Sequence, residues 1–338
     1  MADATSSSPR ALRIVFMGTG PFAVPSFEAM CGAEVRAKGH DVVALVTQPA
    51  RVGRGNRPAP PSPMRVAAEK LGIRILDPES INTDESRALL RELRPDLLIV
   101  ADYGQILSNE SLDVAPLGGI NLHGSLLPKY RGAAPINWAI FKGDAETGVT
   151  VIQMSSKVDA GACLLQAKLV IDPDENAVEL EHRLAALGAP LVVEVVDRLA
   201  MGKVEPLVQD PAQATGARRL RKTDGEVDWN RTAQEIKNQV RGLEPWPRTS
   251  SSWLRAGAEP LRVILTRVGC EIASGGSTAA VGTVVGVTKD EFSIATGSGV
   301  LVVRELQPAG KRAMPAGEFL RGYQVKVGEK FGPAPTES

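Results

Sequence analysis

Asn121 and His123 are the two side chains of this 338-residue sequence whose types and spacing most clearly suggest chemistry. They stand two residues apart at the end of an apolar run, so on a β-strand both side chains project to the same side. An amide and an imidazole that converge on a carbonyl oxygen can donate hydrogen bonds to the negative charge which develops there during acyl transfer. The pair therefore predicts an acyl-transfer site.

Asp159 follows in the stretch SSKVDAGA, a Gly-rich turn after another apolar run. A carboxylate in this position could orient the imidazole and help to pass a proton. The alternative is a purely structural Asp, because Asp-x-Gly turns are common for backbone reasons. The stretch HGSLL does not match the G-x-S-x-G pattern of a serine nucleophile, and no cluster of ligand-type residues predicts a metal. The other two histidines are expected to be structural, His40 at the surface and His182 on a charged helix.

The stretch GTGPFA places Gly18, Gly20 and Ala23 in the G-x-G-x-x-[GA] pattern of a dinucleotide-binding turn. In such folds an acidic residue usually ends the second strand and binds the ribose. Here the second apolar run, 42–47, continues into Gln48-Pro49-Ala50 without Asp or Glu. The turn is therefore expected, whereas a nicotinamide cofactor is a minor alternative that cofactor titration would test.

The elements that must position these residues alternate in the N-terminal half. The apolar strands are uninterrupted rather than alternating, as expected when helices cover both faces of a parallel sheet. This pattern predicts an α/β domain with a doubly wound, mostly parallel, Rossmann-like sheet. The expected strands are 12–17, 42–47, 73–76, 96–101, 118–122 and 148–154, and the expected helices are 23–37, 62–71, 83–93 and 176–201.

The pattern of expected helices and strands changes after residue 206. A helix is expected at 232–242, followed by short β runs at 261–268, 281–287, 291–295 and 299–306. Short strands separated by Gly predict a small antiparallel barrel or sandwich. We therefore expect a disordered tail at 1–10, a first domain at 11–206, a linker at 207–216 and a mainly β domain at 217–332.

The composition predicts a cytoplasmic protein. Its 39 basic and 39 acidic residues balance overall, although residues 212–338 carry 18 basic and 13 acidic residues. Three scattered cysteines form no disulfide framework, and the first residues lack the apolar core of a signal peptide. No long apolar edge or heptad pattern argues for assembly, so we expect a monomer.

The stretch NLHGSLLPKYRGAAPINWAI closely resembles the signature of the formyltransferase family that uses 10-formyltetrahydrofolate. The resemblance implies that Asn121, His123 and Asp159 are the catalytic residues. It implies that SLLP is the folate-binding loop and that ADYGQIL flanks the pterin pocket. The folate-binding residues expected from these two stretches are Ser125, Leu126, Leu127, Pro128, Tyr103, Gly104 and Leu107.

The resemblance extends over nearly the whole chain to the members that formylate the α-amine of methionyl initiator tRNA for translation initiation. TQPARVGRGNRPAPPSPM resembles their Arg/Gly loop, and GEVDWNRTAQEIKNQVRGLEPWP resembles their OB-like C-terminal domain. Two departures stand out: Gly20-Pro21 replaces the usual Pro-Asp, and ARVGRG is one residue shorter than the common loop. Members that formylate amino-sugar nucleotides share SLLPKYRG but lack the Arg/Gly loop. A folate hydrolase and a non-catalytic tRNA-binding module are further alternatives.

Basic residues supply the expected tRNA contacts, because phosphates attract Arg and Lys without reading bases. For the Arg-rich loop near residue 54, the alternative without the nearby signature is a solvated surface. For the basic residues near the domain junction, a solvated linker is an equal alternative. The expected contacts are Arg51, Arg54 and Arg57 in the first loop, with Arg54 favoured, and Arg219, Arg221 and Lys222 near the domain junction.

Overall fold

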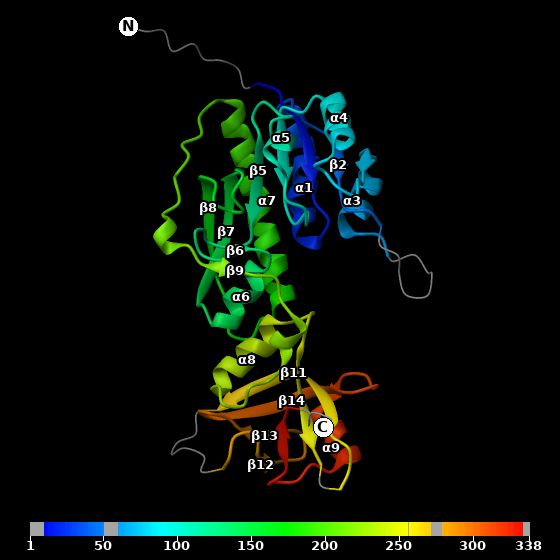
Figure 1. Cartoon of the computed structure of the whole chain (residues 1–338), viewed down its shortest axis with the longest axis vertical. Helices are drawn as coiled ribbons and strands as arrows, with labels where there is room; N and C mark the ends of the chain where they lie inside the picture. Colours follow the sequence, from blue (N-terminus) through cyan, green and yellow to red (C-terminus); the bar gives the residue numbers. More distant parts are fainter. Residues whose placement is uncertain (1–9, 51–59, 256, 272–278, 334–338) are drawn as a thin grey trace. The chain divides into compact units, whose positions relative to one another are not determined.

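The chain is described by a computed structural model over residues 10–50, 60–255, 257–271 and 279–333 (Figure 1). Contacts divide it into two compact units. The first comprises Met1–Pro135, Glu146–Val170 and Glu181–Ala217, and the second comprises Ile136–Ala145, Ile171–Leu180 and Arg218–Ser338. The residues at 207–217, expected largely as a linker, belong to the first unit.

A seven-stranded sheet forms the centre of the first unit, in the order β3-β2-β1-β4-β5-β7-β8. The first five strands in this order run parallel, whereas β7 is antiparallel to both β5 and β8. The predicted doubly wound, mostly parallel sheet is therefore confirmed. The strands are β1 (Arg13–Met17), β2 (Asp41–Val46), β3 (Ile75–Leu76), β4 (Leu97–Val100), β5 (Gly119–His123), β7 (Glu146–Gln153) and β8 (Cys163–Val170).

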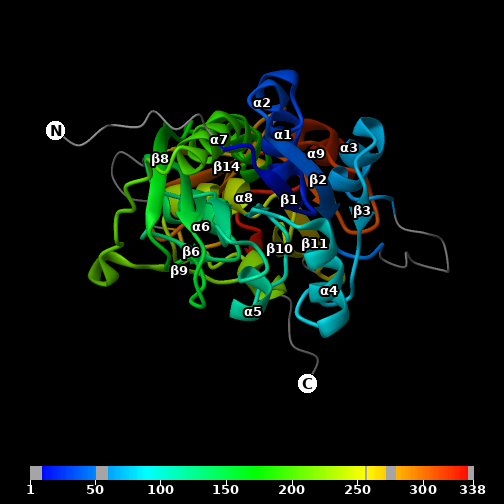
Figure 2. The same ribbon diagram turned by 90° about the horizontal axis from the view of Figure 1, so that it is seen from above.

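Helices cover both faces of this sheet. Figure 2 shows α1 (Val24–Met30) and α7 (Ala177–Ala200) on one side, and α4 (Asp84–Leu93) and α5 (Asn109–Leu112) on the other. The helix expected at 23–37 is two helices, because the chain breaks at Cys31 and Gly32 before α2 (Ala33–Ala37). The first unit also contains α3 (Pro63–Leu71), whereas α6 (Pro135–Lys142) belongs to the second unit apart from its first residue. None of the helices in the described ranges is long and apolar enough to cross a membrane.

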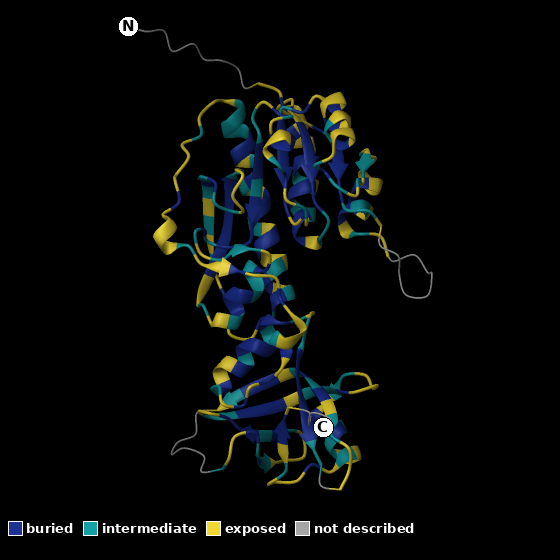
Figure 3. Ribbon diagram, in the orientation of Figure 1, coloured by how far each residue is buried: buried dark blue, intermediate teal, exposed yellow. Residues whose placement is uncertain are grey.

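The inner strands β1, β4 and β5 are mostly apolar because both of their faces are buried, whereas the edge strand β8 alternates between partly buried and exposed residues (Figure 3). Val15 and Met17 pack into a cluster with Leu90 of α4. On the opposite face Phe16 meets Phe27 of α1 edge-on, with ring centroids 5.3 Å apart. Burial of both faces is the arrangement that uninterrupted apolar runs favour.

The expectation that His40 lies at the surface is wrong. The residue is 2% exposed, its Nδ1 accepts a hydrogen bond from Leu12 N, and its Nε2 lies 3.3 Å from Asp197 Oδ1. A buried imidazole with both ring nitrogens partnered is a structural residue that ties the start of β1 to α7.

An antiparallel sheet forms the second unit, in the order β12-β13-β14-β11-β10-β16. An isolated antiparallel bridge between Thr283 and Lys330 joins its two ends, so the sheet closes into a small barrel. Trp253 and Phe331 stack within the core at 6.3 Å between ring centroids. The elements are β10 (Thr249–Leu254), β11 (Leu261–Glu271), β12 (Val284–Val287), β13 (Phe292–Ala295), β14 (Val300–Pro308), β15 (Met314–Pro315), β16 (Lys330–Gly332), α8 (Ala233–Gly242) and α9 (Ala316–Tyr323).

Candidate active site

The carboxyl end of β5 carries Asn121 and His123, as the alternation of the strand predicts. Asn121 pairs with Val100 of β4 and with Ile152 of β7, so the strand lies inside the sheet. Asn121 is half-buried, and His123 is 6% exposed. The carboxyl ends of parallel strands are where open α/β sheets hold their ligands.

Asp159 brings the predicted trio together. Its Oδ1 accepts a long hydrogen bond of 3.4 Å from Asn121 Nδ2, and its Oδ2 lies 3.6 Å from His123 Nδ1. The backbone N–H of Gly132 donates to the same Oδ2 at 2.8 Å. One carboxylate thus contacts both members of the pair and is itself fixed by the backbone.

Gly132 must be glycine for two reasons. Its φ of +120° is a conformation that side chains rarely adopt, and a Cβ would lie 2.7 Å from the backbone oxygen of Ala217. This close approach comes from the pairing of β6 (Arg131–Gly132) with β9 (Gly216–Ala217). Pairing across more than eighty residues of sequence therefore aims the Gly132 N–H at the carboxylate.

The imidazole of His123 has chain atoms at both ring nitrogens. Its Nε2 lies 2.9 Å from the backbone oxygen of Tyr130. A carbonyl oxygen only accepts, so this contact places a hydrogen on Nε2. In the neutral ring Nδ1 then faces Asp159 as an acceptor, and in the protonated ring it faces Asp159 as a donor.

Gln209 holds the turn that carries Asp159. Its Nε2 donates to the backbone oxygens of Asp159 at 2.9 Å and of Gly161 at 2.7 Å. Its Oε1 accepts from Arg131 Nε and Nη2 at 3.1 and 2.7 Å. Sequence reasoning missed Gln209, because it lies in a passage that reads as a linker and carries no motif. Tyr130 and Arg131 were within the quoted signature but were not singled out.

The stretch 125–128 forms a loop tied to β7 and β8. Thr150 Oγ1 donates to Ser125 O at 2.7 Å and accepts from Leu127 N at 3.1 Å. Gln166 Nε2 donates to Leu127 O at 3.1 Å. Ser125 is fully buried and its hydroxyl donates to Lys129 O, while Leu126 and Pro128 are half-buried. The predicted folate loop is therefore rigidly held beside His123.

The second predicted folate segment begins directly after β4. Tyr103 and Leu107 are 2% and 3% exposed and belong to the core, whereas Gly104 is exposed with φ of +86°. Burial raises the pKa of the Tyr103 phenol to about 12. The side chains of Tyr103 and Leu107 thus support the segment from inside, and Gly104 offers its backbone to the surface.

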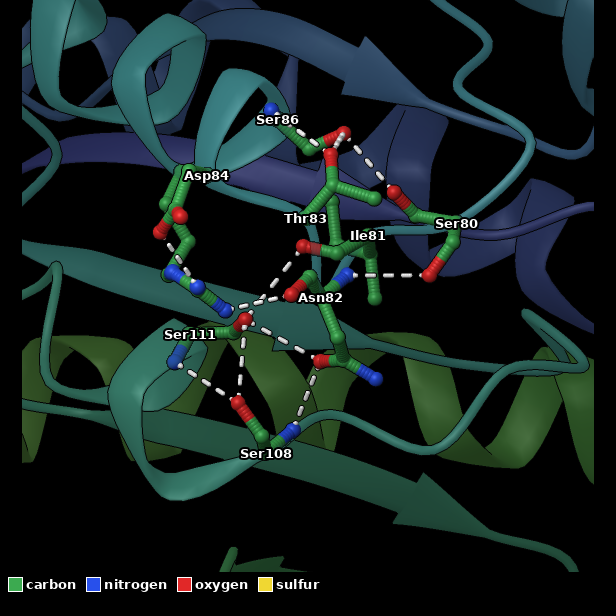
Figure 4. Close-up of polar contacts among 9 residues, drawn as sticks. Ser80, Ile81, Asn82, Thr83, Asp84, Ser86, Ser108 and Ser111 are labelled. Atoms are coloured by element: carbon green, nitrogen blue, oxygen red, sulfur yellow. Dashed lines mark hydrogen bonds and ion pairs between the residues drawn. The ribbon is translucent and has the colours of Figure 1, made fainter.

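A polar network fastens the far end of this segment to the residues before α4. Figure 4 shows Asn82 Oδ1 between Ser108 and Ser111, accepting from Ser108 N at 2.8 Å and from Ser111 Oγ at 3.0 Å. Asn82 Nδ2 donates to the backbone oxygen of Ile106 at 2.8 Å. The stretch from residue 102 to residue 108 is therefore fixed at its C-terminal end.

The basic residues predicted to contact tRNA fall in different parts of the chain. Arg51, Arg54 and Arg57 lie outside the described residues. Arg219, Arg221 and Lys222 are exposed in the second unit, and within the described ranges their side chains make no ion pair. Neighbouring Arg218, by contrast, pairs with Asp224 and lies over the Trp138 ring at 4.9 Å. The three exposed cations are thus available to an anionic partner.

Comparison with known families identifies two matches along the chain. Residues 12–196 match the Formyl transferase family, and residues 219–324 match the Formyl transferase C-terminal domain. The methionyl-tRNA formyltransferase of Citrifermentans bemidjiense is 44% identical over 322 residues, covering 95% of this chain and 96% of that protein. The methionyl-tRNA formyltransferase of Geotalea daltonii is 42% identical, covering 95% and 98%.

Solved structures share the fold at low identity. HypX from Aquifex aeolicus in complex with tetrahydrofolic acid is 17% identical with a TM-score of 0.60, covering 97% of this chain and 50% of that one. The sugar 3N-formyl transferase WlaRD is 17% identical with a TM-score of 0.62, covering 90% and 100%. At 17% identity, both similarities show only that the fold is shared.

Proposed function

The chain belongs to the formyl transferase family, and on that basis we propose that it transfers the formyl group of 10-formyltetrahydrofolate to the α-amine of methionyl initiator tRNA. The observation that carries the proposal is the meeting of Asn121, His123 and Asp159 within a chain that aligns with methionyl-tRNA formyltransferases over 95% of its length. The product is formylmethionyl-tRNA, which serves translation initiation.

Asn121 and His123 stabilise the negative charge that the formyl oxygen gains when the amine attacks. Preorganised donors of this kind supply a large part of acyl-transfer catalysis. The Nε2–H of His123, which the Tyr130 oxygen holds in the free protein, donates to the formyl oxygen, and Asp159 faces the Nδ1 side of the ring. The amide of Asn121 leaves its long contact with Asp159 and donates to the same oxygen.

Asp159 orients the imidazole and carries charge opposite to it. The Gly132 N–H and the Gln209 amide keep this residue in place, so the carboxylate does not need to reorganise during the reaction. Through one water, Asp159 assists the movement of the proton from the attacking amine to the leaving nitrogen. The donor supplies an activated formyl group, and this site needs no covalent intermediate with the protein.

The residues present fit a folate-derived donor, the type that this family uses. The held loop 125–128 lies beside His123, and Gly104 presents exposed backbone next to the end of β4. Backbone groups and apolar side chains with few charges suit a flat, polar-edged ring system. Ser125, Leu126, Leu127, Pro128, Tyr103, Gly104 and Leu107 remain the proposed donor-binding residues.

Methionyl initiator tRNA is favoured over an amino-sugar nucleotide as the acceptor. The methionyl-tRNA formyltransferases match at up to 44% identity along both domains, whereas the sugar formyltransferases match at 17%. Three exposed cations, Arg219, Arg221 and Lys222, would attract a polyanion. Arg54 is the further proposed contact. Because its acceptor takes part in translation, we propose that the protein acts in the cytoplasm. We also propose that it acts as a monomer.

The two acceptors are compared in one experiment. The full chain is incubated with formyl-labelled 10-formyltetrahydrofolate and either methionyl initiator tRNA or an amino-sugar nucleotide, and label on each acceptor is measured. The proposal expects label on the tRNA, sensitive to base hydrolysis of the ester, and background label on the sugar. Transfer to the sugar alone would overturn it, as would no transfer to either acceptor.

A further inference from the structure

Asp102 lies at the point where the strand order of the first sheet reverses. Among the parallel strands, β2 follows β1 on one side and β4 with β5 lies on the other. Ligands of open α/β sheets bind in the crevice outside the strand ends at such a switch point. The backbone oxygen of Asp102, two residues beyond β4, accepts from Thr19 N at 2.9 Å and Gly20 N at 3.3 Å. Asp102 thus joins β4 to the opening turn.

Gly20 makes room for the Asp102 carboxyl. A Cβ built on Gly20 would lie 1.7 Å from Asp102 Oδ2 and 2.7 Å from its Cγ. The backbone of Gly20 has φ of −87° and ψ of 177°, which any residue adopts, so the glycine is not required for its conformation. A side chain at position 20 would therefore have to displace the Asp102 carboxyl, which occupies the place of its Cβ.

The backbone of Asp102 is held in an unusual conformation. Its φ of +44° is uncommon outside glycine and costs free energy that the surroundings must offset. Thr19 Oγ1 and Gln48 Nε2 both donate to the next carbonyl, Tyr103 O, at 3.0 and 3.1 Å. With the Asn82 network at its far end, these contacts fix the backbone of the segment from which the carboxyl projects.

The carboxyl of Asp102 has no hydrogen bond or ion pair with any residue that the structure describes. The residue remains in contact with solvent, yet the surrounding protein raises its pKa to about 6. Glu181 of α7 is close enough for the Asp102 charge to add to the effect of burial, and its pKa rises to about 7. The carboxyl is therefore an exposed acceptor at the switch point, open to a donor from outside the protein.

We propose that Asp102 binds the amino group of the acceptor in the formyl transfer, as an acceptor-positioning residue of the active site. This inference rests on the proposed function. Val100 of β4 is the register partner of Asn121 of β5. Asp102 and His123 each follow this pair by two residues, at the carboxyl ends of adjacent strands. A hydrogen bond from the amine to Asp102 holds the nucleophile over the end of β5, where the trio stands. Gly20 contributes to this contact because it leaves the space that the Asp102 carboxyl occupies.

The test measures whether the affinity of the protein for its acceptor depends on the free amine. Equilibrium binding of methionyl-tRNA and N-acetylmethionyl-tRNA is compared in the wild type and in Asp102→Ala, Asp102→Asn and Gly20→Ala. A hydrogen bond to a charged group corresponds to a preference of about tenfold to hundredfold for the free amine in the wild type. We expect Asp102→Ala and Gly20→Ala to lose this preference, Asp102→Asn to lose most of it, and all three to retain donor affinity.

Asp113→Ala is the matched control, because Asp113 is an exposed carboxyl at the end of α5 outside the site. Undiminished preference for the free amine in a folded Asp102→Ala or Asp102→Asn protein, checked by thermal unfolding, would overturn the inference while leaving the proposed function intact. Loss of the preference in Asp113→Ala as well would also count against it. A wild type that formylates no methionyl-tRNA would overturn both.

Discussion

The carboxylate of Asp159 accepts a 2.8 Å hydrogen bond from the backbone N–H of Gly132, on a strand that pairs with residues 216–217. The same oxygen lies 3.6 Å from His123 Nδ1. The position of the charge opposite the imidazole is therefore set by the fold and not by the Asp159 turn alone. A fixed charge costs no reorganisation when the transition state forms.

Asp159→Asn removes the negative charge of this residue and keeps its shape. The amide oxygen can still accept from Gly132, so we expect the free energy of unfolding to stay within about 1 kcal/mol of the wild type. Loss of the charge should lower kcat by about 10²–10³-fold. Asp159→Ala should show the same kcat loss and an added destabilisation of about 1–3 kcal/mol from the unpaired N–H. A near-normal kcat for Asp159→Asn in steady-state assays would refute the role.

Thr150→Val tests the loop that we assign to the donor. The threonine hydroxyl bonds Ser125 O, Leu127 N and Gln166 Nε2, and the residue is fully buried. Valine keeps the volume but leaves these groups unpaired, so unfolding should require about 1–3 kcal/mol less, measured by urea denaturation. The KM for the donor should rise. Thr150→Ser, which keeps the hydroxyl, is the control, and equal donor KM values in all three proteins would contradict the assignment.

The exposed cations of the second unit should act through charge. Replacing Arg219, Arg221 and Lys222 together by Gln should raise the KM for tRNA and leave kcat unchanged. The slope of log(kcat/KM) against log salt concentration should become shallower by about 1–2, because fewer counterions are released on binding. Lys168→Gln removes an exposed cation that is already paired with Glu146 and should change neither quantity. An unaltered salt slope in the triple variant would remove this cluster from the interface.

The raised pKa of Asp102 predicts a pH-dependent stability. Its pKa moves from 3.8 to about 6 and that of Glu181 from 4.5 to about 7, so the folded state binds these protons more tightly than the unfolded state. Their contribution to stability is fully present below about pH 4 and is lost as pH rises through 6 to 7. Asp102→Asn should therefore gain stability relative to the wild type between pH 5 and pH 8. Urea denaturation across this range would disprove the prediction if the difference between the two proteins were constant.

The sequence predicted the parts of this structure that depend on local patterns. Apolar runs marked the buried strands, and the two-residue spacing of Asn121 and His123 placed both side chains against Asp159. Strand β10 was missed because its buried residues, Thr249 to Ser252, are small and polar and show no apolar alternation. The break at Gly32 was missed because the apolar pattern continues through it.

The supports of the site could not be predicted in the same way. Gly132 reaches Asp159 because β6 pairs with β9, and Gln209 reaches the Asp159 turn from fifty residues away. Gln209 carries no local signal, and although Gly132 lies within the NLHGSLLPKYRGAAPINWAI stretch, no local pattern predicts its contact with Asp159. The room that Gly20 provides for Asp102 is likewise a tertiary contact, between residues that follow two different strands, and no local pattern predicted it.

The rate of formyl transfer in a single turnover, with the protein saturated by both substrates, tests the central claim most directly, because it reports chemistry without binding or product release. Asn121→Ala should slow this step by about 10²–10³-fold relative to the wild type. Asn230→Ala, which removes an amide bonded to Asp228 in the second unit, should not slow it. A folded Asn121→Ala protein that transfers the formyl group at the wild-type rate would contradict the account.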